Sequence, residues 1–368
     1  MKFGIVNRSD DSIFPYQAWP TVARDENGVL YVVASSHRVS HICPFGQNHM
    51  YISRDEGKTW SAPIVINNTK LDDRDAGLVC LGDGKLLMTF FNHPIAAYQN
   101  KYRKFIENNT NDLNHDMTMG LLNKLDLLPP EDDHPGSFVR VSHDGGMTWD
   151  APIKAPITSP HGPIKLKNGK LLWLGRQFHT AGYEDAVYAF ESSDEGKTWD
   201  LLSRVPDVED FEAVRFSKND FPCEPDTVEL EDGTLLGFIR LKTNIKGVEM
   251  TTYTTRSEDG GRTWSTPAPT GEHGAPAHVI RHSSGALVMV YSYRMTPCGE
   301  RARISYDNGK TWSRPVVISE ASPTWDCGYP SSVELSDGSI LTVYYQHYKD
   351  DKFNSILFTN WTLDEVKE

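Results

Sequence analysis

The chain has 368 residues and a formal net charge of −13, with 24% charged and 38% hydrophobic residues. No cluster of Lys and Arg interleaved with aromatic residues occurs, so the composition argues against a nucleic-acid partner. No hydrophobic run reaches membrane-spanning length, and the opening segment MKFGIVNRSDDSIFPYQ lacks the apolar stretch of a signal peptide. We therefore expect no membrane partner and a cytoplasmic location.

The five cysteines are odd in number and lack the spacing of a metal site. Scattered cysteines of this kind are typical of free thiols in a reducing compartment rather than of a disulfide framework. We expect neither a metal nor a cofactor. The cysteines are Cys43, Cys80, Cys223, Cys298 and Cys327.

A pattern of the form Ser-x-Asp-x-Gly-x-Thr-Trp occurs five times, typically at intervals of roughly fifty residues. Such repetition predicts an architecture in which one supersecondary unit cannot bury its apolar face alone. The copies are Ser53–Trp60, Ser142–Trp149, Ser192–Trp199, Ser257–Trp264 and Ser305–Trp312.

Each copy has the composition of a tight turn that leads into a strand. The short Asp carboxylate accepts hydrogen bonds from nearby backbone N–H groups, Gly tolerates a positive φ, and Thr and Trp favour a strand. We interpret the five Asp residues as turn formers rather than ligands of a metal or substrate. Each Trp is expected to pack between neighbouring units.

A second repeat lies between the copies and consists of two apolar strands joined by a Gly turn, which is typical of an antiparallel hairpin. Six such hairpins occur, and the amino-terminal KFGIV could supply the strand that closes a ring. The sequence predicts one domain, residues 1–368, folded as an all-β six-bladed β-propeller. The turns are Asn27-Gly28, Asp83-Gly84, Asn168-Gly169, Asp232-Gly233, Ser284-Gly285 and Asp337-Gly338.

One segment interrupts the repeat, at about residues 95–136 in the second blade. It contains KYRKFIENN and MGLLNKLDLL, which are typical of short helices. Because it joins a second strand to a third strand, the insertion should emerge on the same face as the first-strand starts. There it could form a lid or a dimer contact, so a homo-oligomer is compatible with the sequence.

Ionisable and aromatic residues collect where first strands begin and second strands end, which is one rim of the predicted propeller. Loops held by a rigid scaffold are where binding and catalytic residues usually lie. A rim that mixes cations, carboxylates and a phenol suits an anionic sugar. The candidates are Arg38, Arg74, Asp75, His93, His161, Arg176, Glu224, Asp226, Arg240, Arg294 and Tyr329.

With these repeats the chain resembles the sialidase (neuraminidase) superfamily, whose six-bladed propeller carries Asp boxes of this form. The resemblance implies a Tyr nucleophile paired with a Glu, an Asp acid/base and three Arg residues that hold a carboxylate. It assigns Tyr329 as the nucleophile, Glu224 as its partner and Arg240 as the second Arg. The third Arg is Arg294 in YSYR or Arg301 in GERARIS.

Two positions depart from the family pattern. Gln17-Ala18-Trp19-Pro20 places Ala18 where the family has its first Arg, and CPFGQNHMYIS has only His41 or His49 near the usual acid/base position. The sequence Asp72-Asp73-Arg74-Asp75 offers substitutes. We expect Arg74 to replace the Arg and Asp75 the proton donor, and we interpret Asp72 and Asp73 as solvated loop charges.

The resemblance favours an exo-glycosidase that releases a terminal acidic sugar with retention through a Tyr-linked intermediate, with a small saccharide as its substrate. The same fold also suits a propeller glycosidase acting on another terminal sugar, such as a rhamnoside linked to a uronic acid, with His161 or His93 as acid/base. A polysaccharide lyase and a non-catalytic sugar-binding propeller are further alternatives, because a fold does not fix a function.

Overall fold

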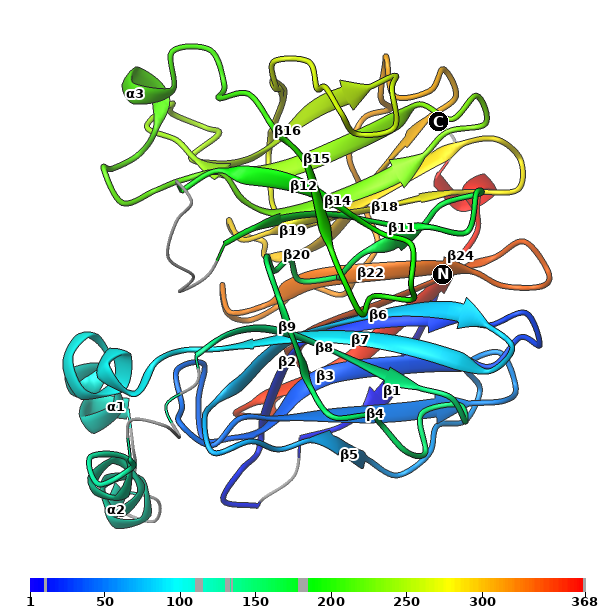
Figure 1. Ribbon diagram of the computed structural model, residues 1–368. Coiled ribbons are helices and arrows are strands. Elements are labelled where there is room, and N and C mark those ends of the chain that lie inside the picture. Colours follow the sequence, from blue (N-terminus) through cyan, green and yellow to red (C-terminus); the bar gives the residue numbers. More distant parts are fainter. Residues whose placement is uncertain (10–11, 110–114, 130–132, 134, 178–184, 367–368) are drawn as a thin grey trace.

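The computed structural model describes residues 1–9, 12–109, 115–129, 133, 135–177 and 185–366. Six four-stranded antiparallel sheets make up the body of the protein (Figure 1). The prediction of a six-bladed propeller is confirmed. In blades one to three the strands run β2 (Tyr16–Arg24), β3 (Leu30–Arg38), β4 (Gln47–Ser53), β5 (Ile64–Asn67); β6 (Asp73–Gly82), β7 (Lys85–Asn92), β8 (Gly136–Ser142), β9 (Ile153–Ala155); β10 (Ile164–Lys165), β11 (Leu171–Arg176), β12 (Val187–Ser192), β13 (Asp200–Arg204).

The sixth blade closes the ring, because its outer strand comes from the other end of the chain. Lys2 pairs with Asn360 and Phe3 with Thr359, so the amino-terminal strand covers the last edge, as expected from KFGIV. In blades four to six the strands are β14 (Cys223–Glu229), β15 (Leu235–Lys242), β16 (Met250–Ser257), β17 (Ala268–His273); β18 (Ala277–Arg281), β19 (Leu287–Tyr293), β20 (Gly299–Ser305), β21 (Val316–Val317); β22 (Gly328–Glu334), β23 (Ile340–His347), β24 (Asn354–Trp361), β1 (Lys2–Asn7).

Six of the apolar clusters formed by the described residues each join two neighbouring blades. One cluster joins blade six to blade one, for example through Leu341 and Leu30, and another joins blade one to blade two through Met50 and Leu86. Four further clusters continue this pattern around the ring. A single blade therefore cannot bury its own faces, which is why the repeat has to close on itself.

The Asp boxes form the turns that their composition predicts. In the first copy Asp55 accepts hydrogen bonds from the Thr59 backbone N–H and hydroxyl at 2.9 and 2.7 Å, and the Ser53 hydroxyl accepts one from the Gly57 N–H at 2.9 Å. A Cβ on Gly57, whose φ is +81°, would lie 2.5 Å from Leu341 of the preceding blade. The Asp box thus packs between two blades, and both oxygens of the Asp55 carboxylate accept hydrogen bonds within the turn.

Helices lie outside the sheets. The insertion contains the π-helix η1 (Ala97–Lys101), α1 (Arg103–Asn109) and α2 (His115–Leu125), whereas its residues 110–114, 130–132 and 134 lie outside the described part of the chain. Figure 1 shows α1, α2 and the short α3 (Phe211–Val214) on the left, and both chain ends on the right. The 3-10 helix η3 (Leu363–Val366) follows the last strand. No described helix has the length and apolarity needed to span a membrane.

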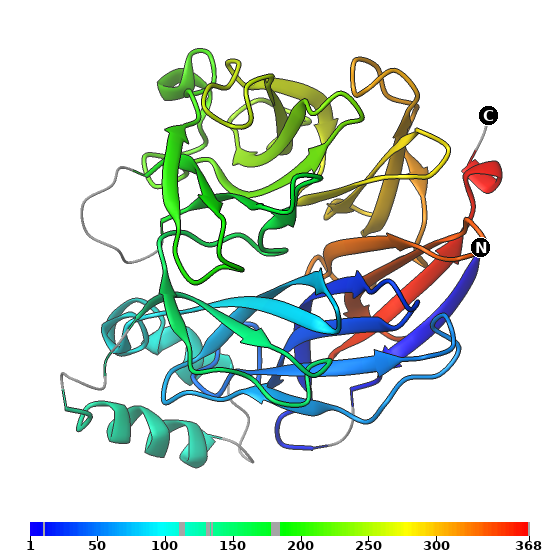
Figure 2. The same ribbon diagram turned by 45° about the vertical axis from the view of Figure 1, so that its right-hand side comes forward.

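The insertion packs through its own apolar cluster, which contains Tyr98, Ile106 and Leu122 together with Leu71 at the entrance to blade two. Figure 2 shows its helices beside the strands of the first two blades, at the same side of the molecule as in Figure 1. The insertion therefore emerges on the face predicted from its place between a second and a third strand.

Candidate functional site

Four innermost strands carry a bulge at the same relative position. Trp19, Asp75, Glu224 and Tyr329 adopt left-handed φ values of 54°, 45°, 48° and 50°, and the strand register shifts beside each of them. Residues other than Gly adopt this conformation at a cost of roughly 1–3 kcal/mol, and such residues concentrate at functional sites. The same bulge thus recurs in four blades, and in each it directs one side chain towards the centre of the propeller.

Serines of the neighbouring blade hold two of these bulges. The Asp75 N–H donates to the Ser35 hydroxyl at 3.1 Å, and the Tyr329 N–H donates to the Ser292 hydroxyl at 2.8 Å. Ser35 and Ser292 lie at equivalent places, on the second strands of blades one and five. The bulge conformation is therefore set by contacts between blades, which the sequence of one blade does not reveal.

All four bulge residues line one cavity of about 590 Å³, which we call the central cavity. It has the size of a small-molecule binding site. Its wall carries more cationic groups than carboxylates, although the whole chain has a net charge of −13. The charged lining residues are Arg74, Asp75, Arg176, Glu224, Arg240, Lys242 and Arg294.

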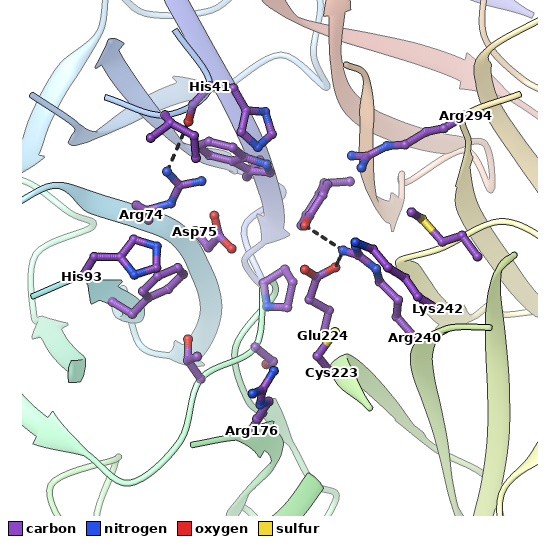
Figure 3. A pocket seen from close by; sticks show the side chains of 18 of the residues that line it. His41, Arg74, Asp75, His93, Arg176, Cys223, Glu224, Arg240, Lys242 and Arg294 are labelled. Atoms are coloured by element: carbon purple, nitrogen blue, oxygen red, sulfur yellow. Dashed lines mark hydrogen bonds and ion pairs between the residues drawn. The ribbon is translucent and has the colours of Figure 1, made fainter. Parts of the chain in front are cut away.

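Tyr329, Arg240 and Glu224 form a connected group in the central cavity. Arg240 Nη1 donates to Glu224 Oε2 and, at 3.3 Å, to the phenol oxygen of Tyr329 (Figure 3). Burial, followed by the nearby Glu224 carboxylate, raises the pKa of Tyr329 well above its usual value. The phenol is therefore neutral at neutral pH, and a carboxylate that can take its proton is close by.

Arg294 approaches the same phenol from blade five. Its Nε donates to the Cys327 carbonyl at 2.9 Å, its Nη2 donates to the Tyr345 hydroxyl at 3.1 Å, and its guanidinium carbon lies 5.5 Å from the centre of the Tyr329 ring. These contacts fix the direction of the guanidinium, which Figure 3 shows pointing into the cavity opposite Asp75. Two guanidinium groups thus approach the phenol from neighbouring blades.

Asp75 is the carboxyl group on the opposite wall. Figure 3 shows its side chain directed towards the space that Glu224 faces. Burial raises the pKa of Asp75 to about 7, with the negative charge of Glu224 contributing and Arg74 opposing. Its Oδ1 is buried and has no hydrogen-bond partner among the described residues. A carboxyl group with this pKa is protonated in a substantial fraction of molecules at neutral pH, as a general acid requires.

Arg74 lies beside Asp75 and is held by a buried network. Its guanidinium carbon is 4.3 Å from the centre of the Trp19 ring, and Nη1 donates to the His41 carbonyl at 3.2 Å and to Asp72 at 3.4 Å. Asp72 also accepts a hydrogen bond from the Tyr98 hydroxyl, at 2.6 Å. The insertion is thereby connected to a cation of the cavity wall.

Arg176 lies at the far end of the cavity, and Lys242 lines the wall beside Arg240 (Figure 3). Arg176 forms an ion pair with Asp185, and its guanidinium carbon lies 5.3 Å from the centre of the Phe221 ring. His93 and Tyr102 line the cavity on the side of the insertion, with their rings 5.6 Å apart. The insertion therefore contributes a side chain to the wall.

The structure brings eight of the predicted rim residues to one cavity and places four other candidates elsewhere. The eight are Arg74, Asp75, His93, Arg176, Glu224, Arg240, Arg294 and Tyr329. Arg38 is fully buried and donates to Asp72 at 2.5 and 3.0 Å, behind Arg74. Asp226 accepts from the Val279 backbone N–H at 2.7 Å and so joins blades four and five. Arg301 lies on a third strand, with its guanidinium carbon 3.3 Å from the centre of the Tyr293 ring.

His161 is the fourth candidate outside the cavity. Its ring is buried, lies edge-on to His278 at 4.9 Å and has Nδ1 3.2 Å from the Thr21 hydroxyl.

Asp72 and Asp73, interpreted as solvated, are both buried. Asp72 accepts a hydrogen bond from Tyr98 of the insertion, and Asp73, the first residue of β6, accepts hydrogen bonds from Thr69 and Asn92. That interpretation is wrong for both residues.

Several lining residues were not predicted as site residues. Trp19 and His41 come from the segments that lack the family's Arg and Asp, and Tyr102 lies in the insertion, where no repeat defines a register. Lys242 was recognisable, since it lies two positions beyond Arg240 on the same strand and such residues point to the same face. Among the described residues, no group of three or more His, Cys, Asp or Glu could hold a metal ion.

The fold and the cavity define an Asp-box propeller with a cationic central site. The chain belongs to the BNR repeat-like domain family, whose model matches residues 136–342, and the BNR/Asp-box repeat model matches residues 51–62. No curated protein sequence matches the chain.

Solved structures resemble the whole chain at low sequence identity. A Dyadobacter fermentans protein of unknown function is 21% identical, with 98% of this chain and 97% of that chain covered and a TM-score of 0.74. The Streptococcus pneumoniae NanB sialidase is 15% identical, with 98% and 70% covered and a TM-score of 0.69. A Penicillium chrysogenum α-L-arabinanase is 15% identical, with 99% of each chain covered and a TM-score of 0.61. The fold is thus that of the sialidase-like propellers, and the resemblance stated from the repeats is confirmed.

Proposed function

We propose that the protein is a sialidase-like exo-glycosidase that releases a terminal acidic sugar with retention of configuration. The observation that carries this proposal is the group formed by Tyr329, Arg240 and Glu224 in a cationic cavity, with Asp75 on the opposite wall. A neutral phenol is suited to attack an anomeric carbon that bears a carboxylate, because it avoids the repulsion that a second carboxylate would experience.

In the first step the phenol oxygen of Tyr329 bonds to the anomeric carbon while the bond to the leaving-group oxygen breaks. Asp75 gives its proton to that oxygen, and Glu224 takes the phenol proton. Arg240 donates to the phenol oxygen and therefore stabilises negative charge as it develops there. The product of this step is a glycosyl-tyrosine.

In the second step Asp75, now a carboxylate, takes a proton from water. The water oxygen bonds to the anomeric carbon, the bond to Tyr329 breaks, and Glu224 returns its proton to the phenol. Two displacements on opposite faces retain the configuration. Arg294 and Arg240 would hold the substrate carboxylate, with Arg74 supplying the cation that Ala18 cannot.

A second candidate is a glycosidase for a different terminal sugar. Ala18 is fully buried, and the adjacent Trp19 lines the cavity with an apolar ring. The α-L-arabinanase of similar fold is complexed with arabinobiose, a disaccharide without a carboxylate, which supports this second candidate.

The test is a screen of aryl glycosides of sialic acid, rhamnose and uronic acids, with the anomer of the first product identified by proton NMR. We expect hydrolysis of the sialoside with retention. Tyr329→Phe and Glu224→Gln should each lower kcat by at least about a hundredfold with an unchanged circular dichroism spectrum. Matched controls are Tyr306→Phe and Glu229→Gln; Tyr306 is 65% exposed on an Asp box, and Glu229 lies at the other end of the Glu224 strand.

Normal turnover in Tyr329→Phe or Glu224→Gln would remove that residue from the mechanism. Inversion of configuration would exclude the glycosyl-tyrosine, and an unsaturated product absorbing in the ultraviolet would identify a lyase. Hydrolysis of the rhamnoside alone would favour the second candidate.

A further inference from the structure

Trp325 is the one exposed tryptophan among the nine of the chain, all of which lie in the described residues. It is 63% exposed and lines the central cavity, whereas the other eight are buried or partly buried. Isolated surface hydrophobic residues need no explanation, but an indole at the opening of a polar cavity is a typical contact for a ligand. The exposed face of Trp325 is therefore available to a molecule that enters the cavity.

The loop that carries Trp325 is fixed on both sides. Asp326 accepts hydrogen bonds from the Tyr16 and Tyr345 hydroxyls at 3.0 and 3.1 Å, and the Cys327 carbonyl accepts one from Arg294. Before Trp325, the Ser322 hydroxyl donates to the Thr324 carbonyl at 2.9 Å. A tryptophan has only two side-chain torsions, so an indole on a rigid backbone loses little entropy when it binds a ligand.

His41 supplies a polar group beside the indole. Its ring lies 6.3 Å from that of Trp325, and its Nδ1 lies 2.9 Å from Asp326 Oδ1. Because the carboxylate only accepts, Nδ1 carries the hydrogen and donates it, which leaves Nε2 as an acceptor. Burial lowers the pKa of His41, with Asp326 opposing, so the ring is neutral at neutral pH.

The position of this pair relates it to the reaction centre. Trp325 lies in the loop directly before β22, whose bulge carries Tyr329, and His41 lies at the end of the cavity opposite Arg176 (Figure 3). The terminal sugar in the proposed reaction occupies the depth of the cavity, against Tyr329 and Glu224. The part of the substrate that extends to an exposed indole is then the leaving group.

We propose that Trp325 and His41 form a subsite for a sugar ring on the leaving-group side of the scissile bond. A pyranose has an apolar C–H face that matches an indole, and hydroxyl groups at its edge that can donate to His41 Nε2. The preferred substrate is therefore an oligosaccharide rather than a glycoside of a small alcohol. The direction of the substrate rests on the proposed function, whereas binding of a sugar to Trp325 does not.

The kinetic test compares 3′-sialyllactose with methyl α-sialoside. Trp325→Ala should lower the ratio of kcat/KM for the lactoside to that for the methyl glycoside by roughly tenfold or more, mainly through KM. His41→Phe, which keeps a ring but removes the acceptor, should lower the same ratio by a smaller factor. Tyr306→Ala is the matched control, because Tyr306 is equally exposed but lies on an Asp box away from the cavity. An unchanged ratio in Trp325→Ala would overturn the subsite.

A binding test separates this inference from the proposed function. The indole N–H resonance of Trp325, assigned by its loss in Trp325→Phe, should shift when the full-length protein is titrated with lactose. A shift without turnover of any glycoside would preserve the sugar subsite and reject the glycosidase. Turnover with no shift of this resonance and an unchanged substrate ratio would preserve the glycosidase and reject the sugar subsite. If neither turnover nor a shift were observed, both proposals would be rejected.

Discussion

Asp72 joins the insertion, the second blade and the cavity wall, and its replacement by Asn tests whether this network holds the site together. The carboxylate is 1% exposed and accepts hydrogen bonds from Arg38, Arg74 and the Tyr98 hydroxyl. Although burial opposes its ionisation, the two guanidinium groups keep the pKa of Asp72 below its usual value. Asn removes the negative charge that faces both guanidinium groups, so Arg38 loses its carboxylate partner and, of its two carboxylate neighbours, Arg74 keeps only Asp75.

The expected loss follows from the uncompensated charge of Arg38. Removing one partner of a buried ion pair costs about 3–5 kcal/mol of folding free energy, because the remaining charge stays desolvated. With an unfolding entropy of about 2.1 cal/mol/K per residue over 368 residues, Asp72→Asn should therefore unfold at a temperature lower by roughly 4–6 °C. KM for the acidic substrate should also rise, because Arg74 loses one of the contacts that direct it into the cavity.

The assays at pH 7 are urea denaturation followed by intrinsic fluorescence for the folding free energy, thermal denaturation for the unfolding temperature, and steady-state kinetics for KM. Asp207→Asn is the matched control, since the pair between Asp207 and Arg204 has side chains that are 48% and 35% exposed and should contribute less than about 1 kcal/mol. A loss for Asp72→Asn no larger than that of the control would show that the buried network does not stabilise the fold as argued.

Three further predictions concern protonation and charge. Because the pKa of Asp75 in the free protein is about 7 and its acid form donates the proton, kcat/KM should fall as the pH rises through about 7; if Asp75→Asn showed the same fall in kcat/KM, Asp75 would be excluded as the donor. Burial raises the pKa of Glu300 from 4.5 to about 8, so the folding stability of the wild type should fall as the pH rises from 4.5 to 8. Glu300→Gln should therefore be more stable than the wild type by about 1 kcal/mol or more at pH 8 but not at pH 4.5. Denaturation at each pH measures both proteins, and parallel curves of stability against pH would contradict this. Arg294→Ala should raise KM for the acidic substrate by roughly tenfold or more, whereas Arg301→Ala should change it less than about twofold; equal effects in steady-state assays would refute the choice between them.

The blade arrangement was predictable because local chemistry and packing agree. Each Asp box forms its turn from residues within eight positions, and each hairpin needs only a Gly turn between two apolar strands. The closing strand was predictable by counting, since six hairpins without it would leave one sheet edge open. Candidates at the first-strand starts and second-strand ends, such as Glu224 and Arg240, followed from the same register.

Placement of residues by strand register was wrong where a bulge or a contact with a neighbouring blade redirects a side chain. Counting outward from the turns placed Arg38 on the rim, but two register shifts between β2 and β3 accompany its burial against Asp72. Asp226 is two positions from Glu224, yet the bulge between Cys223 and Asp226 turns it towards blade five. A shift of one residue in a strand reverses the face of every following side chain, so small irregularities redirect individual candidates.

The sequence by itself determined the number of blades, the turn chemistry, the location of the insertion and most of the charged residues of the cavity. These features depend on periodicity and on residues close together in the chain. Only the tertiary structure decided that Asp72 is buried, that Arg294 rather than Arg301 faces Tyr329, and that Trp325 is exposed beside His41. The reason is that each of these depends on contacts between blades distant in sequence, and burial and electrostatic environment arise only when the ring is closed.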